Sequence, residues 1–273
     1  MRVKDQLSRL DVRPSKSRGQ NFIIDESLLD AVVTFGAPSS SDKLIEIGPG
    51  LGALTERLLK IAPVIAIEIE EQFCRELEGR FSNITTVNED VRLVDFSQFG
   101  SDLVVFGNLP YRLSTDILFH LVAFSANIRR AVIMVQREFA QRMAAVPGGK
   151  EYGVLSVSVQ LTASAKLGPT IPGSAFHPPT AVTSQLIELT FRPYPGVLPE
   201  EIPAMKRIVA AAFSQRRKMI KNTLKASKIA DGDKVELSLE QAGIAGTRRA
   251  ETVSIDEYIK LTRVLRPFLN AKL

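Results

Sequence analysis

The sequence contains very few of the side chains from which disulfides and zinc sites are built. Its 273 residues include one cysteine, Cys74, and two histidines, His120 and His177. One thiol cannot form an intramolecular disulfide, and these three residues lack the spacing of a zinc ligand set. Cys74 falls in the helix-like run EEQFCRELEGRF, where we expect a packed, inert thiol. We therefore predict neither a disulfide framework nor a metal centre.

The sequence also lacks long apolar runs. No stretch reaches the roughly 18 to 20 consecutive apolar residues that span a bilayer. The opening segment MRVKDQLSRLDVRPSKSRG is charged throughout and has no apolar centre of the kind found in signal peptides. These absences predict a cytoplasmic protein with no membrane segment. No apolar heptad pattern suggests an obligate dimer, which favours a monomer.

The charge that the chain carries is unevenly distributed. Residues 1–195 hold 20 basic and 21 acidic side chains, whereas residues 196–273 hold 15 and 9. A second basic cluster lies in the opening segment and consists of Arg2, Lys4, Arg9, Arg13, Lys16 and Arg18. Two basic ends favour a polyanionic partner such as RNA. A solvated charged surface would have the same composition, so charge alone leaves both interpretations open.

The region from Leu44 to Phe191 alternates short β-branched apolar runs with amphipathic segments. The apolar runs include LIEI, VIAIEI, ITTV, LVVF and AVIMV, and the amphipathic segments include ALTERLLKI, STDILFHLVAF and REFAQRMAAV. This alternation is typical of repeated βα units that form a parallel sheet covered on both faces. Before it, Asp25 is placed to cap a helix through LLDAVVTF that ends at Gly36 and Pro38.

The loop RPYPGVLPEEIP, with four prolines and a glycine, is the predicted domain boundary. LIELTF, just before it, is a late strand, and the pattern after it is helical throughout, from AMKRIVAAAF to DEYIKLTRVLRPFL. The segment VLSVSVQL alternates like a strand, but its type stays open for a reason given below. We predict an α/β domain over 1–195 and a small all-helical domain over 196–273.

The segment LIEIGPGLGALTERL combines a strand, a glycine-rich turn and the start of a helix. Gly48, Gly50 and Gly52 let the backbone approach a ligand, and the helix start offers unpaired amides. Gly48, Gly50 and Ala53 also satisfy the dinucleotide fingerprint, so a nicotinamide enzyme remains open at this step. A glycine turn with a structural role only is the other alternative.

Two acidic residues end the next strand units. Glu68 closes VIAIE about 20 residues after the glycine loop, where its carboxylate can accept both ribose hydroxyls of a nucleoside cofactor. Asp90 ends ITTVNED at the same edge of the sheet, where ligands of open α/β sheets bind. A turn or capping role for Asp90 is equally consistent with its position.

The turn Asn108-Leu109-Pro110-Tyr111 follows the fourth strand and carries the most specific chemistry. The amine of adenine is a poor nucleophile because its lone pair is delocalised into the ring. If the Asn108 side-chain oxygen and the Leu109 carbonyl accept both N–H hydrogens, the nitrogen is drawn toward tetrahedral geometry. Pro110 stiffens the turn, and Tyr111 offers a face on which an extruded base can stack. Phe176 in FHPP is placed to close the other face, although packing explains an aromatic there equally well.

A basic cluster follows the predicted boundary, in the segment SQRRKMIKNTLK. We expect these residues to lie on a helix whose face carries Arg217, Lys221 and Lys225 at spacings of four. Such a stripe suits RNA phosphates. The predicted RNA-binding residues are Arg216, Arg217, Lys218, Lys221 and Lys225.

The motifs together resemble the ribosomal RNA adenine dimethyltransferase family of the KsgA type. In chain order they are GQNFIID, EIGPGLGALT, VIAIE, NED, NLPY, FHPP and AFSQRRKMIKNTL, and they span nearly the whole chain. The resemblance implies a class I methyltransferase sheet with a small helical C-terminal domain, and a helix at VLSVSVQL. It also implies S-adenosylmethionine as cofactor and two neighbouring adenines near the 3′ end of small-subunit (16S) ribosomal RNA as the target.

By that resemblance, the cofactor site consists of Asn21, Ile23, Gly48, Gly50, Glu68, Asp90 and Asn108, with Glu46 contacting it indirectly. The catalytic residues implied are Asn108, Leu109, Pro110, Tyr111 and Phe176. The chain departs from the family pattern FxPPPKVDS, since Thr180, Ala181 and Thr183 replace the usual Pro, Lys and Asp. Contacts made by those three positions are therefore not carried over.

Three further functions compete with this one. A related enzyme that dimethylates an adenine of large-subunit RNA shares the motifs, although QRRKMIKN favours the small-subunit target. A non-catalytic RNA-binding assembly factor would explain the basic ends but not the intact NLPY turn. The nicotinamide oxidoreductase leaves both NLPY and the basic cluster unexplained.

Overall fold

The computed structural model describes residues 3–12, 14 and 20–270 of the chain. It divides into two compact units. The first comprises Met1–Ala140 and Ser164–Arg192, and the second comprises Gln141–Ala163 and Pro193–Leu273. The second of the two segments of this unit begins in the proline-rich loop, near the predicted boundary. The unit also includes residues 141–163, which our sequence-based division assigned to the α/β domain.

The first unit is built on a seven-stranded sheet with the order β4-β3-β2-β5-β6-β9-β7. Neighbouring strands from β4 to β6 run parallel, and β9 is antiparallel to β6. The predicted class I methyltransferase type of mostly parallel sheet is therefore confirmed. The strands are β2 (Lys43–Ile47), β3 (Val64–Glu68), β4 (Ile84–Asn88), β5 (Leu103–Asn108), β6 (Ile128–Gln136), β7 (Ala163–Ile171) and β9 (Ser184–Phe191).

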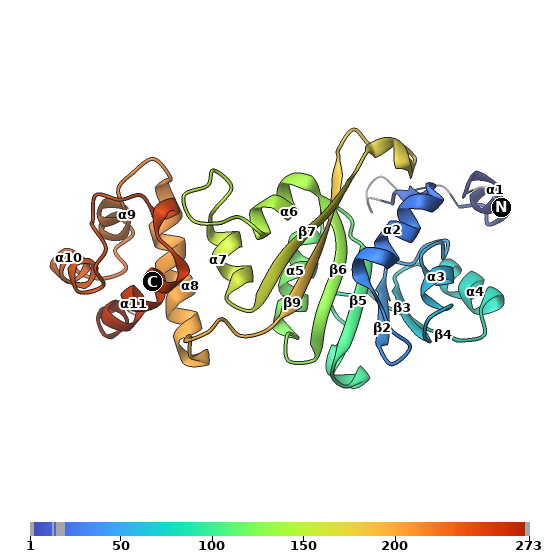
Figure 1. Ribbon diagram of the computed structural model, residues 1–273, viewed down its shortest axis with the longest axis horizontal. Helices are drawn as coiled ribbons and strands as arrows, with labels where there is room; N and C mark the ends of the chain where they lie inside the picture. The colour runs from blue at the N-terminus through green and yellow to red at the C-terminus, as the bar shows by residue number, and fades with distance from the viewer. Residues whose placement is uncertain (1–2, 13, 15–19, 271–273) are drawn as a thin grey trace. The chain divides into compact units, whose positions relative to one another are not determined.

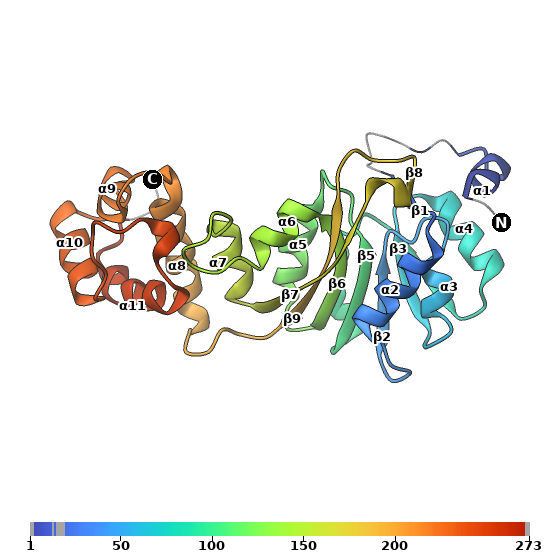
Figure 2. The same ribbon diagram turned by 45° about the horizontal axis from the view of Figure 1, so that its top comes forward.

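Helices cover both faces of this sheet, with α2 (Glu26–Gly36) on one and α5 (Ser114–Ala123) on the other (Figures 1 and 2). The strands between them are buried almost along their whole length, as in β5, where residues 103–107 are all buried. Asp25 caps α2 as predicted, since its carboxylate accepts the Leu28 amide. The remaining helices of this unit are α1 (Val3–Arg9), α3 (Thr55–Leu58), α4 (Glu71–Arg80) and most of α6 (Arg137–Met143).

A separate two-stranded sheet joins the N-terminal segment to the FHPP segment. β1 (Phe22–Ile23) pairs antiparallel with β8 (Phe176–His177). α1 precedes β1 and packs through Leu7, which is 4% exposed, while Arg9 forms an ion pair with Glu76 of α4. Of the predicted basic opening cluster, Arg2, Arg13, Lys16 and Arg18 lie outside the described residues.

The second unit is helical among its described residues, apart from an isolated bridge between Met219 and Arg249. The open segment VLSVSVQL is helix α7 (Val154–Gln160). Its alternation is not a solvent pattern, because Ser156 is 0% exposed and its hydroxyl donates to the Arg142 carbonyl at 2.6 Å. The other helices are α8 (Ile202–Ala212), α9 (Ile220–Ala226), α10 (Gly232–Gln241) and α11 (Ile255–Leu265), which share one apolar core.

Within the described part of the chain, every helix is too short or too polar to cross a bilayer.

Candidate active site

A cavity of about 340 Å³ lies at the carboxyl ends of β2, β3, β4 and β5. This volume falls in the range of small-molecule sites, and its position is where open α/β sheets bind ligands. The walls bring together residues far apart in the sequence. Predicted cofactor residues that line it are Asn21, Ile23, Glu46, Gly48, Gly50, Glu68, Asp90 and Asn108.

The glycine loop after β2 adopts a backbone that other residues rarely accept. Gly48 has φ of 65° and Gly50 has φ of 52°, both in the left-handed region. A side chain at Gly48 would meet no atom within 4 Å, so the loop backbone is bare on that side. At Gly50 a Cβ would instead come within 2.9 Å of the Phe22 ring. The loop therefore needs glycine for conformation at the first position and also for space at the second.

Glu68 is held by the loop that it faces. One carboxylate oxygen accepts the Gly50 amide at 3.1 Å, and the other accepts the Glu70 amide at 3.0 Å. The residue is only 6% exposed. These bonds fix the side chain at the wall of the cavity.

Glu46 lies deeper, at 2% exposure, and accepts the Thr55 hydroxyl at 2.6 Å. Burial raises the pKa of this carboxyl to about 7, and the negative charge of Glu68 adds to the shift, while the Thr55 hydrogen bond opposes it. Near neutral pH the Glu46 carboxyl is therefore present in both its protonated and its ionised form.

Asp90 follows β4 and is clasped by a residue that the sequence analysis did not single out. The Arg92 guanidinium donates to both Asp90 oxygens, with Nε 3.0 Å from Oδ1 and Nη2 2.5 Å from Oδ2. These hydrogen bonds hold the pKa of Asp90 below its usual range. Both residues line the cavity.

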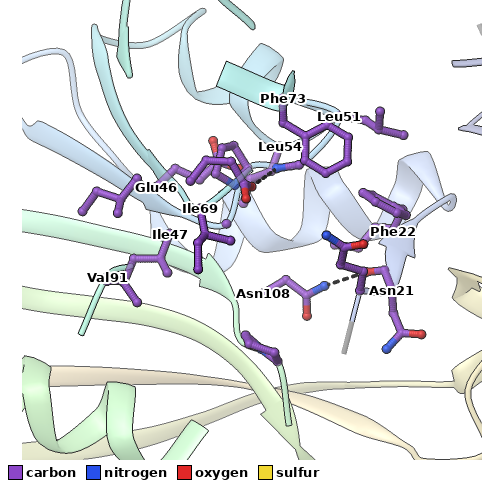
Figure 3. A pocket seen from close by; sticks show the side chains of 18 of the residues that line it. Asn21, Phe22, Glu46, Ile47, Leu51, Leu54, Ile69, Phe73, Val91 and Asn108 are labelled. Atoms are coloured by element: carbon purple, nitrogen blue, oxygen red, sulfur yellow. Dashed lines mark hydrogen bonds between the residues drawn. The ribbon is translucent and has the colours of Figure 1, made fainter. Parts of the chain in front are cut away.

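Asn108 is the last residue of β5. In the strand order β4-β3-β2-β5, it lies at the opposite end from Asp90, which follows β4. Its side-chain nitrogen donates to the Asn21 carbonyl at 3.0 Å (Figure 3). Figure 3 also shows Ile69 and Val91 on one side of the pocket, with Phe22 and Phe73 on the other. Because a side-chain amide nitrogen only donates, the Asn108 oxygen is the group that can accept a hydrogen bond from a ligand.

The rest of the NLPY turn is rigidly held. The Leu109 amide donates to the Met134 carbonyl at 3.0 Å, and the Pro110 carbonyl accepts from the Leu113 amide and the Ser114 hydroxyl. No described residue donates a hydrogen bond to the Leu109 carbonyl. Two acceptors, the Asn108 side-chain oxygen and the Leu109 carbonyl, therefore belong to consecutive residues. Asn108 lines the cavity, whereas Leu109, which is 1% exposed, is not part of its lining.

The family description "Ribosomal RNA adenine dimethylase" matches residues 13–266 of the chain. The chain belongs to the ribosomal RNA adenine dimethylase family. Membership confirms the predicted enzyme class, an S-adenosylmethionine-dependent methyltransferase that acts on adenine in ribosomal RNA. It removes the nicotinamide oxidoreductase from consideration.

Individual relatives of this dimethylase agree in sequence and in fold. The ribosomal RNA small subunit methyltransferase A of Anaeromyxobacter sp. strain K is 38% identical, over 95% of this chain and 96% of that protein. A dimethyladenosine transferase from Plasmodium falciparum has a TM-score of 0.74 at 22% identity, over 90% of this chain and 98% of that one. The 23S rRNA methyltransferase ErmE has a TM-score of 0.70 at 22% identity, over 90% and 100%. The last two share the fold.

Three aromatic or sulfur-bearing residues of the dimethylase lie outside the cavity lining. Tyr111 forms a 2.7 Å hydrogen bond through its hydroxyl with the buried Ser184, a partner that the sequence analysis missed. Phe176, the first residue of β8, is 1% exposed and belongs to the apolar core cluster that includes Ile23 of β1. Cys74 is 4% exposed and burial raises its pKa, so the prediction of a packed thiol is confirmed.

The predicted basic helix of the dimethylase is wrong at its start. α9 begins at Ile220, and Met219 before it is extended, with ψ of 146°, because it bridges to Arg249. Arg217 therefore lies in a turn and does not share a helix face with Lys221 and Lys225. Two members of the cluster also have acidic partners, since Arg216 pairs with Glu251 and Lys225 pairs with Glu236.

Proposed function

We propose that this dimethylase transfers two methyl groups to the N6 amine of each of two adjacent adenines near the 3′ end of small-subunit ribosomal RNA. The observation that carries the proposal is the pair of acceptors in the NLPY turn, Asn108 and Leu109, beside a cavity that the glycine loop lines. The small-subunit target is supported by the name of the 38% identical relative.

The cavity fits S-adenosylmethionine by the chemistry of its walls. Gly48 and Gly50 leave room against the loop backbone, Glu68 offers acceptors for ribose hydroxyls, and Asp90 offers acceptors for a base amine. Asn21 and Ile23 close the cavity from the N-terminal side, and Glu46 supports the loop through Thr55. When bound, the cofactor supplies a methyl group on a positively charged sulfur.

The NLPY turn prepares the amine for direct, in-line transfer. Asn108 accepts one amine hydrogen and the Leu109 carbonyl accepts the other, which localises the nitrogen lone pair and directs it at the methyl carbon. The bound cofactor would supply the methyl carbon to this nitrogen, its sulfur would keep the electrons of the C–S bond, and the methylated amine would then lose one proton to water. The proposed transfer needs no metal, no covalent intermediate and no strong general base.

Tyr111 and Phe176 are proposed to sandwich the target base. Ser184 holds the Tyr111 hydroxyl, so that ring is already fixed beside the turn. Phe176 is 1% exposed, so its contact requires the side chain to shift as the base enters. A base extruded from its stack commonly finds this kind of aromatic pocket.

The basic residues of the second unit, Arg216, Arg217, Lys218, Lys221 and Lys225, are proposed to contact RNA phosphates. Their arrangement in a turn followed by a short helix suits an irregular phosphate backbone as well as a continuous stripe would. We further propose that the enzyme acts as a monomer in the cytoplasm on an assembling small subunit.

A methyl-transfer assay on unmodified small ribosomal subunits, with labelled S-adenosylmethionine and mass-spectrometric site mapping, tests the proposal. The expected products are two adjacent N6,N6-dimethyladenines in small-subunit RNA. Methylation of large-subunit RNA instead would identify the related macrolide-resistance type of enzyme. Binding to subunits without any transfer would favour a non-catalytic assembly factor.

A further inference from the structure

Asp90 has nearly all its hydrogen-bonding capacity used within the protein. Its Oδ1 accepts the Arg92 amide at 3.0 Å and the Arg92 Nε at 3.0 Å, and its Oδ2 accepts Nη2 at 2.5 Å and the same Nε at 3.2 Å. A carboxylate offers about four acceptor sites. Nε carries a single hydrogen, so its contacts to Oδ1 and Oδ2 are one shared bond, and the protein donates three hydrogens to Asp90 in all. One site on Oδ2 therefore stays available for a ligand, and the two-pronged guanidinium fixes the plane in which it points.

The clasp around Asp90 is anchored from α5, the helix that follows the NLPY turn. Arg92 Nη1 lies 3.7 Å from the Asp116 carboxylate of that helix. His120, one turn further along α5, contacts the Val94 carbonyl at 2.9 Å through Nε2. The loop that carries Asp90 is thus attached to α5 at two places.

Strand order indicates which part of the cofactor Asp90 meets. The glycine loop follows β2, Glu68 ends β3 and Asp90 follows β4, so the three groups lie side by side along the sheet edge. If Glu68 binds the ribose, as proposed above, the base lies one strand further out, at Asp90. The group there that an acceptor can bind is the exocyclic amine of the cofactor's adenine.

We propose that Arg92, supported by Asp116, is a positioning residue that makes Asp90 a receptor selective for an amine and thereby sets the enzyme's preference for an adenine nucleoside cofactor. The inference rests on the proposed cofactor role of Asp90. An ionised carboxylate held in one plane accepts an N–H but has no hydrogen to donate to a carbonyl. In a cofactor analogue with a carbonyl in place of the amine, the carbonyl oxygen would lie against the Asp90 carboxylate. Both groups are acceptors, so no hydrogen bond could form between them.

The role of Arg92 differs from that of a simple stabilising ion pair. Without the clasp, the Asp90 side chain turns more freely, and its pKa, lowered chiefly by the Arg92 hydrogen bonds, returns toward its ordinary value. Because the carboxyl stays ionised near neutral pH in either case, the loss of orientation is what reduces the contrast between amine and carbonyl ligands. Asp116 is more exposed, at 61% of its side chain, and only supports the guanidinium, so its loss matters less.

The test measures dissociation constants by calorimetry for S-adenosylhomocysteine and S-inosylhomocysteine, which carries a carbonyl in place of the amine. The full-length enzyme should prefer the adenine ligand by at least about tenfold, as expected for one hydrogen bond to a charged group. Arg92→Gln should reduce this ratio of dissociation constants to below about threefold, mainly by weakening the binding of the adenine ligand. Arg92→Lys, which keeps the charge but not the fork, should give an intermediate ratio.

Two further variants complete the comparison. Asp116→Asn should lower the ratio by less than about twofold. Arg75→Gln breaks the exposed ion pair with Glu71 on α4, away from the cavity lining, and should leave the ratio unchanged. An unchanged ratio in Arg92→Gln, or tighter binding of the adenine ligand, would overturn the proposal, the second because it means that Arg92 competes with the amine.

The outcome also separates this proposal from the proposed function. If the unmodified enzyme binds neither ligand, the assignment of the cavity to the cofactor fails. If it binds both ligands equally, the placement of Asp90 at the base fails together with the inference. If the enzyme shows the preference and folded Arg92→Lys and Arg92→Gln retain it in full, only the role of Arg92 fails.

Discussion

The polar groups of the cavity and the basic groups of the second unit are held in different ways. Around the cavity, Glu68, Asp90 and Asn108 are fixed by hydrogen bonds to backbone or to a neighbouring side chain. In the second unit, Arg216 and Lys225 are exposed and paired at the surface. The difference indicates that chemistry depends on single, pre-oriented groups, whereas RNA attraction is shared among many weak ones.

The strongest test of this contrast is Asn108→Ala. Loss of one pre-oriented acceptor should reduce the turnover number by at least about a hundredfold, measured as methyl transfer to small subunits at saturating cofactor. The matched control is Asn127→Ala, which removes a similar side-chain bond, to the Gly100 carbonyl, outside the cavity lining. Near-normal turnover of Asn108→Ala would mean that methyl transfer does not depend on this single acceptor and that the contrast with the RNA contacts is wrong.

The cavity should also show a pH dependence that the basic surface lacks. Native Glu46, with its pKa raised to about 7, binds a proton more tightly than the unfolded chain does. Its stabilising effect is complete below about pH 4.5 and is lost as the pH rises through about 7. Relative to the unmodified enzyme, Glu46→Gln should therefore gain about 2 to 3 kcal/mol of unfolding free energy between about pH 5 and about pH 8.

Chemical denaturation at several pH values measures this gain. Glu56→Gln on α3, where the side chain is 51% exposed, is the control and should show a difference near zero at every pH. A Glu46→Gln difference that does not change with pH would show that the buried carboxyl is already ionised at about pH 5.

The basic residues should contribute additively to RNA affinity, and their contribution should weaken as the salt concentration rises. Replacing Arg217, Lys218 and Lys221 together by Gln should weaken RNA binding about tenfold and make the slope of log affinity against log salt less negative by about 2. The turnover number at saturating RNA should stay unchanged. Filter binding across a salt series measures the slope, and a slope equal to that of the unmodified enzyme would place the RNA elsewhere.

The smallest effect is expected for Lys225→Gln. Because Lys225 already pairs with Glu236, its replacement should change RNA affinity by less than about threefold and stability by about 0.2 to 1 kcal/mol. Titrations that measure the RNA affinity of Lys225→Gln and Lys218→Gln would show which replacement has the larger effect. A larger effect at Lys225 would mean that RNA displaces Glu236 from the pair.

The regular parts of the fold were predictable because they rest on burial. Parallel strands covered on both faces must be apolar along their length, so β2, β3, β5 and β6 were evident as runs of apolar residues. β7 carried no such signal, since it is an edge strand with exposed residues and contains Gly168 and Pro169. The two-residue strands β1 and β8 are too short to leave a pattern.

The site was predictable wherever a residue type is demanded by its chemistry or backbone. The left-handed conformations of Gly48 and Gly50 and the strand-end positions of Glu68 and Asp90 follow from the motif and the fold. The partners Arg92 and Ser184 were not predictable, because their roles depend on contacts that only tertiary structure creates. The same applies to the bridge from Met219 to Arg249, which interrupts the predicted basic helix before α9 begins at Ile220.

The most direct test of the central claim is a crystal structure of the enzyme with S-adenosylhomocysteine and a short RNA that contains the target adenines. We expect the amine nitrogen of one target base within about 2.7 to 3.2 Å of both the Asn108 side-chain oxygen and the Leu109 carbonyl, facing the cofactor sulfur. A target amine bound away from both acceptors, or an Asn108 oxygen turned toward the protein interior, would contradict it.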